Sequence, residues 1–86
     1  MYEIFLSHQA KNFIKNLDEK TKTKLMEVFE ILKDIPIPYR HYDVSKIRGR
    51  ENIYRIRISS LRVLYCIIEI DEKIRILKIG YRENFY

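Results

Sequence analysis

The stretch YRIRISSLRVLYCIIEI, residues 54–70, decides the fold class of this chain of 86 residues. Residues 54–58 alternate three apolar side chains with Arg55 and Arg57, and this period of two predicts a strand with one apolar and one basic face. Residues 61–70 are almost all apolar, and most are β-branched or aromatic, which predicts a central strand of the same sheet.

Upstream of this stretch the periodicity is that of helices. A short strand at residues 2–6 leads to Ser7, a favourable helix N-cap, and apolar residues spaced i, i+3, i+4, i+7 predict an amphipathic helix over 8–17. Asp18 is a second N-cap, and the same spacing predicts a helix over 19–35 that the following prolines end. The short link between the two helices favours an antiparallel hairpin.

Downstream, Asp71 and Glu72 predict a turn, and residues 73–81 predict a last strand. The fold is therefore expected to be α+β, with an N-terminal strand and a two-helix hairpin packed on a largely antiparallel four-stranded sheet, in the order β-α-α-β-β-β. The whole chain, residues 1–86, is expected to form one domain.

Composition excludes several classes of protein. Cys66 is the only cysteine, so the chain cannot form an internal disulfide, and one cysteine cannot by itself build a metal site. No stretch approaches the roughly 18 apolar residues that a membrane span needs. The N-terminus lacks the basic segment and the long apolar segment of a signal peptide, and we therefore expect a cytoplasmic protein.

Positive charge is concentrated in one segment. Residues 40–65 contain seven basic side chains against Asp43 and Glu51, a net charge of +5, which equals that of the whole chain. Arg55 and Arg57 project from the same face of one strand, about 7 Å apart. A cluster of arginines indicates an anion-binding surface, with nucleic acid as the first candidate. A solvated basic face without a ligand is the alternative interpretation.

Four short segments follow one another in the second half of the chain: KIRG at 46–49, YRIRI at 54–58, LRVLY at 61–65 and GYRENFY at 80–86. In this order and spacing they resemble the motifs of the RelE/ParE superfamily of toxins. The similarity in length and element order extends over essentially the whole chain.

The resemblance implies the toxin of a type II toxin–antitoxin system, a ribosome-dependent mRNA endoribonuclease that cleaves in the A site. In such toxins the 2′-hydroxyl attacks the adjacent phosphate, and neither a metal nor a cofactor takes part. The implied partners are a RelB-like antitoxin, in a toxin–antitoxin hetero-oligomer, and the ribosome with its rRNA and mRNA.

The resemblance also implies which residues act. Its catalytic positions correspond to Arg57, Arg62, Arg82 and Tyr86. Arg62 and Arg82 would stabilise the charge that develops on the phosphate, and Arg57, with Arg55, would hold the backbone and orient the nucleotide. Tyr86 would stack on a base or contact the 2′-hydroxyl.

The RNA-binding positions correspond to Lys46, Arg48, Arg50 and Arg55. Two features depart from the family pattern: Arg55 and Arg57 stand where well-known members have lysine, and Tyr81 stands where histidine is frequent. The identity of the general base is therefore left open, and Tyr81, Tyr86 or a ribosomal group could act as this base. A ParE-like DNA gyrase inhibitor and a catalytically inactive antitoxin-binding protein remain alternatives, because fold does not fix function.

Overall fold

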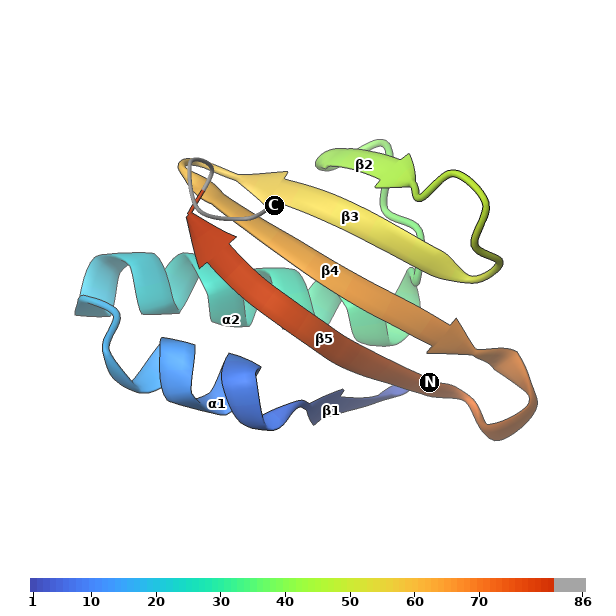
Figure 1. Ribbon diagram of the computed structural model, residues 1–86, viewed down its shortest axis with the longest axis horizontal. Coiled ribbons are helices and arrows are strands. Elements are labelled where there is room, and N and C mark those ends of the chain that lie inside the picture. Colours follow the sequence, from blue (N-terminus) through green and yellow to red (C-terminus); the bar gives the residue numbers. More distant parts are fainter. Residues whose placement is uncertain (82–86) are drawn as a thin grey trace.

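The computed structural model describes residues 1–81 as a five-stranded sheet that carries two helices on one face (Figure 1). The elements are β1 (Glu3–Leu6), α1 (His8–Lys15), α2 (Glu19–Asp34), β2 (Asp43–Lys46), β3 (Ile53–Ile58), β4 (Leu61–Ile68), the 3₁₀ turn η1 (Glu69–Asp71) and β5 (Lys73–Tyr81). The strands lie in the order β1-β5-β4-β3-β2, with β1 parallel to β5 and the other pairs antiparallel.

This architecture confirms the predicted α+β class, with the two helices packed on a largely antiparallel sheet. The predicted number of strands was wrong, because the sheet has five strands and not four. The additional strand is β2, which contains a single apolar residue, Val44, between polar neighbours. Four residues of this composition carry no periodic signal, and the strand exists because it pairs with β3.

Both helices begin at the predicted caps. The Ser7 hydroxyl accepts a hydrogen bond from the Ala10 amide at 3.1 Å, and the Asp18 carboxylate accepts one from Thr21 at 3.2 Å. The hydrogen bonds from Thr21 hold the pKa of Asp18 below its ordinary value. In Figure 1 the two helices run in opposite directions, as the predicted hairpin requires. No helix among residues 1–81 combines the length and the apolarity needed to cross a membrane.

The β3–β4 hairpin fixes which side chains share a face. Ile58 pairs with Leu61, so only Ser59 and Ser60 form the turn, and Ser59 takes a left-handed conformation with φ of 54°. Ile56 then pairs with Val63 on the face toward the helices, and both side chains are fully buried. The intervening positions of both strands point to the opposite face.

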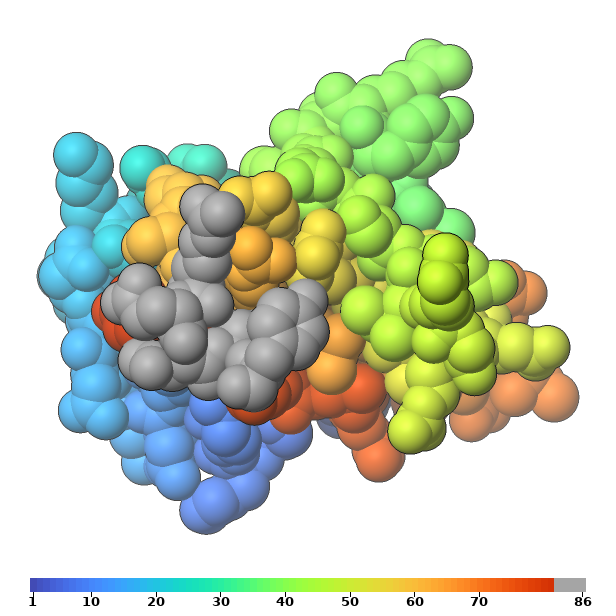
Figure 2. Space-filling view, turned by 45° about the horizontal axis from the view of Figure 1, so that its top comes forward, coloured from blue at the N-terminus to red at the C-terminus, as the bar shows by residue number. Residues whose placement is uncertain are grey.

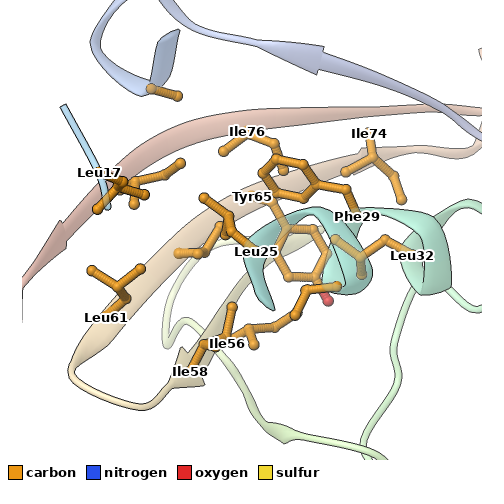
Figure 3. Close-up of a cluster of buried hydrophobic side chains, with 14 of the residues drawn as sticks. Leu17, Leu25, Phe29, Leu32, Ile56, Ile58, Leu61, Tyr65, Ile74 and Ile76 are labelled. Carbon is orange, nitrogen blue, oxygen red and sulfur yellow. The ribbon is translucent and has the colours of Figure 1, made fainter. Parts of the chain in front are cut away.

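The core lies between α2 and the sheet, where apolar side chains of the helix meet those of the three central strands (Figure 3). Its fully buried members include Leu25, Val28 and Leu32 of α2 and Ile56, Val63, Tyr65, Ile74, Ile76 and Ile79 of the sheet. Burying one such side chain contributes about 1.5–3 kcal/mol. This contact holds the sheet in place while its other face remains uncovered by either helix.

Tyr65 connects the central strand to the segment that follows α2. Its hydroxyl donates a 2.7 Å hydrogen bond to the carbonyl oxygen of Pro36, and its ring stacks on Tyr54 at 5.8 Å between centroids. Burial, with a smaller contribution from Tyr54, raises the pKa of the Tyr65 phenol far above its ordinary value. The hydroxyl therefore remains protonated and keeps donating over the whole physiological pH range.

The far half of β5 pairs with β4 on one edge, and on its other edge α1 takes the place of a strand. Strand β1 ends at Leu6, and beyond that point the Gln9 side chain takes over the pairing. Its amide nitrogen donates to the Ile79 carbonyl at 2.7 Å, and its oxygen accepts from the Ile79 amide at 2.9 Å. One side chain thus satisfies both backbone groups of Ile79 on the edge of β5 that β1 does not reach.

Replacing Tyr65 with phenylalanine should lower the free energy of unfolding by about 1 kcal/mol, because a buried hydroxyl and the Pro36 carbonyl lose their hydrogen bond. Chemical denaturation monitored by circular dichroism measures the change. Tyr54→Phe is the matched control, since the described contacts of Tyr54 are ring contacts and it should stay close to wild type. An equal loss in both variants would contradict the structural importance of the Tyr65 hydroxyl.

Replacing Gln9 with alanine should cost about 1–3 kcal/mol of unfolding free energy, because the amide and the carbonyl of Ile79 both lose their partner. Hydrogen exchange should show the same change locally, as faster exchange of the Ile79 amide. Asn12→Ala, on the exposed side of the same helix, is the control. Unchanged Ile79 exchange in the Gln9 variant would show that other contacts hold this edge.

Candidate functional site

The face of the sheet opposite the helices gathers arginines from two neighbouring strands. Arg57 of β3 is the direct cross-strand partner of Arg62 of β4, and Arg55 pairs with Leu64 one step further along. The apolar residues between them point into the core, so all three arginines share the other face. The structure therefore brings together three of the predicted site residues, Arg55, Arg57 and Arg62, and we call them the arginine cluster.

Arg62 is the most enclosed member of the arginine cluster. Its relative exposure is 8%, the lowest of any charged residue in the described chain, and it pairs with Arg57 on one side and with Gly80 on the other. Burial makes a guanidinium interact more strongly with a nearby anion, because water screens the charge less. Arg62 is thus suited to stabilise negative charge at a fixed point above the sheet.

Arg55 is held by the neighbouring edge strand. Its Nη2 donates a 3.0 Å hydrogen bond to the hydroxyl of Ser45, the residue that pairs with it on β2. Its Nε is buried and has no hydrogen-bond partner among residues 1–81. Buried donors without a partner are rare in folded proteins, and a catalytic role is one explanation for them.

Arg57 forms an ion pair with β2. Its Nη1 lies 3.5 Å from an oxygen of Asp43, again the residue opposite it in register. The side chains are 37% and 56% exposed, so the pair contributes little to stability. A guanidinium has five N–H donors, and this single long contact leaves most of those of Arg57 for an anion.

A bulge in β5 brings Lys78 to the same face. Leu64 pairs with Lys78 but Tyr65 pairs with Ile76, so Leu77 is an extra residue in β5. The extra residue reverses the alternation, which puts Ile79 into the core and directs Lys78 to the arginine side. Sequence reasoning missed Lys78, although the change from a spacing of two to a spacing of three in the apolar residues of β5 marks the bulge.

The predicted RNA-binding residues Lys46, Arg48 and Arg50 form a separate group. Lys46 pairs with Tyr54, whose ring faces the core, so its side chain does not lie on the arginine side. Arg48 and Arg50 lie in the loop between β2 and β3, around a hollow of about 410 Å³ lined by residues 46–51. Figure 2 shows this yellow-green loop at the margin of the molecule.

Two predicted catalytic residues, Arg82 and Tyr86, lie outside the described residues. The described chain ends with Tyr81, which pairs with Leu61 next to Arg62. Tyr81 itself faces the helices, where its ring lies 5.3 Å from that of Phe13. Its side chain is thus directed away from the arginine cluster, and this direction argues against Tyr81 as the general base.

The described part of the site offers charge but no histidine. His8 begins α1 and His41 precedes β2, so neither lies on a strand of the arginine cluster. Among residues 1–81 no group of three His, Cys, Asp or Glu side chains could hold a metal ion. The arrangement can bind a phosphate and stabilise additional negative charge on it.

Comparison with known proteins assigns the chain to a family. The family model described as ParE toxin of type II toxin-antitoxin system, parDE, matches residues 4–86. A relative from Methanocaldococcus jannaschii, named "Putative toxin RelE1", is 37% identical over 73 residues, which cover 85% of this chain and 81% of the relative. The chain therefore belongs to the RelE/ParE superfamily of type II toxin–antitoxin toxins, and the resemblance seen in the sequence is confirmed.

Solved structures agree with this assignment. The archaeal RelE–RelB complex from Pyrococcus horikoshii contains a chain with a TM-score of 0.87 and 28% identity, and the match covers 96% of this chain and 97% of that one. The Escherichia coli RelBE complex gives a TM-score of 0.82 at 19% identity, with coverage of 98% and 100%. At this lower identity the likeness shows the fold alone.

The arginine cluster should dominate binding to a polyanion. Arg55→Ala should weaken binding to a short single-stranded RNA and reduce the slope of log affinity against log salt by about 0.7, the value for one lost phosphate contact. Fluorescence anisotropy over a salt series measures both quantities. Lys20→Ala, an equal change of charge on α2, should leave both nearly unchanged, and an equal effect at Lys20 would show that binding depends only on net charge.

Proposed function

We propose that this toxin is a ribosome-dependent endoribonuclease that cleaves mRNA in the ribosomal A site. The observation that supports the proposal most directly is the arginine cluster, in which Arg57 lies directly opposite the nearly buried Arg62. Like charges placed opposite one another destabilise a sheet, so a purely structural sheet gains nothing from this pair. A transition state with additional negative charge on a phosphate gains from it directly.

The proposed reaction is transesterification within the RNA chain. The 2′-oxygen attacks the adjacent phosphorus while the bond from phosphorus to the 5′-oxygen breaks, leaving a 2′,3′-cyclic phosphate and a 5′-hydroxyl. The proton of the 2′-hydroxyl leaves to a base, and the departing 5′-oxygen gains a proton. Arg62 and Arg57 would stabilise the charge on the phosphate oxygens, and Arg82 and Tyr86 are proposed to complete the catalytic set.

Binding of the substrate would be divided between two groups of residues. Arg55, anchored to Ser45, would hold the mRNA backbone beside the scissile phosphate. Lys46, Arg48 and Arg50 lie on and after β2, away from the cluster, and would contact phosphates at a greater distance, including those of rRNA. These contacts would set the orientation of the toxin on the ribosome.

The side chains of the described site support the proposed dependence on the ribosome. Arginine keeps its proton and cannot act as a general base, and the arginine side of β3, β4 and β5 carries no histidine. A ribosomal group or Tyr86 would therefore accept the proton of the 2′-hydroxyl. Positioning by the ribosome would also hold the attacking oxygen in line, which contributes strongly to such reactions.

The proposed protein partner is an antitoxin. The solved relatives from Pyrococcus horikoshii and Escherichia coli are complexes of RelE with RelB, and a RelB-like protein would neutralise this chain in a toxin–antitoxin hetero-oligomer. An acidic segment of that antitoxin would be complementary to the arginine cluster. A toxin that acts on translating ribosomes would work in the cytoplasm.

Replacing Arg62 with alanine should reduce cleavage of translated mRNA about 100-fold or more, because the least solvated positive charge of the site is removed. Primer extension on an mRNA translated in vitro maps the cuts, with a ribosome-free reaction beside it. Arg62→Lys retains a charge but not the planar fork of donors, and should recover only part of the activity. Lys20→Ala is the control of equal charge.

Each outcome of this experiment has a defined meaning. Cuts at A-site codons that need ribosomes and disappear with Arg62→Ala support the proposal. Cuts that persist fully in folded Arg62→Ala would remove the arginine cluster from the mechanism. Intact mRNA with inhibition of purified DNA gyrase would favour the ParE-like alternative. Intact mRNA with antitoxin binding alone would favour a catalytically inactive member of the family.

A further inference from the structure

Strand β2 contacts the arginine cluster through two side chains that the proposed catalytic and RNA-binding sets do not include. Asp43 and Ser45 occupy alternate positions of β2, and each lies opposite an arginine of β3 in register. Asp43 contacts Arg57 at 3.5 Å, and Ser45 accepts a 3.0 Å hydrogen bond from Arg55. Each arginine of β3 therefore has its own partner on the neighbouring strand.

The two contacts reduce two unfavourable contributions to the free energy of the site, the repulsion between like charges and the entropy lost when an arginine side chain is fixed. Arg57 lies directly across from Arg62, and the carboxylate of Asp43 partly offsets the repulsion between these like charges. An arginine side chain also has several rotatable bonds, and fixing it at the moment of binding costs entropy. A side chain that is already fixed before the phosphate arrives avoids part of this cost.

We propose that Asp43 and Ser45 are positioning residues, which fix the guanidinium groups of Arg57 and Arg55 for contact with a phosphate of the RNA substrate. This inference rests on the proposed function, because it concerns the same site. Asp43 acts through Arg57 alone and does not touch the RNA. Since Asp43 engages one nitrogen of the guanidinium, most of the five N–H donors of Arg57 are left for a phosphate.

Asp43 is expected to have opposite effects on RNA binding and on the cleavage step. As a negative charge near the RNA backbone it weakens attraction between toxin and RNA. As the partner of Arg57 it favours the arrangement in which cleavage occurs. Removing the charge should thus slow the chemical step without weakening binding, and this split separates positioning from a simple contribution to folding.

The test is single-turnover cleavage of mRNA on programmed ribosomes, with toxin in excess and varied in concentration. We expect Asp43→Asn to lower the rate constant at saturation about 2- to 5-fold, the range for one exposed ion pair. The half-saturating concentration should stay the same or fall. Asp43→Glu, which retains the carboxylate, should recover most of the rate.

A merely structural role gives a different pattern. A smaller folded fraction lowers the effective toxin concentration, so it would raise the half-saturating concentration and leave the saturating rate constant unchanged. In an Arg57→Ala background, Asp43→Asn should cause no further loss, because its effect passes through Arg57. The same loss in both backgrounds, or no recovery with Asp43→Glu, would overturn the inference.

A second measurement keeps this inference separate from the proposed function. The NMR order parameter of the Arg57 Nε–H bond in the free toxin should fall in Asp43→Asn and stay high in Ser45→Ala. Ser45→Ala should loosen Arg55 instead, and so each variant is the control for the other. Absence of any cleavage by wild type would refute the proposed function, whereas unchanged order parameters would refute the positioning by β2.

Discussion

The site depends on the register of the β3–β4 hairpin. Because Ser59 and Ser60 alone form the turn, Arg57 must pair with Arg62, and the apolar residues beside them must point into the core. A shift of the register by one residue would exchange the two faces and bury the arginines. The burial of Ile56 and Val63 against α2 therefore determines where the positive charge lies.

The strands on both sides of the hairpin place side chains next to the arginine cluster. On one side β2 supplies a carboxylate and a hydroxyl to the arginines of β3, which offsets part of the repulsion within the cluster. On the other side the bulge at Leu77 turns Lys78 toward the cluster while Ile79 stays in the core. Gln9 then holds the backbone of this displaced segment through two hydrogen bonds.

The same arrangement explains why the part of the site within residues 1–81 provides charge and not proton transfer. Side chains that project from a sheet whose opposite face is a packed core can gather closely, and arginine keeps its charge under such conditions. Tyr81 is excluded from this face because the bulge directs its ring to Phe13. The remaining chemistry would come from Tyr86 or from the ribosome, as in the reaction that we propose.

The sequence by itself determined the features that depend on local periodicity. The helix caps Ser7 and Asp18, the helical hairpin and the basic face of residues 54–58 follow from side chains close together in the chain. The family motifs identified the superfamily because each motif is also a short run of neighbouring residues. Only the tertiary structure decided the existence of β2, the partners of Arg55 and Arg57, the direction of Lys78 and the separation of Lys46 from the arginine cluster. These features arise from the register in which one strand pairs with the next, and the local composition of each strand does not encode that register.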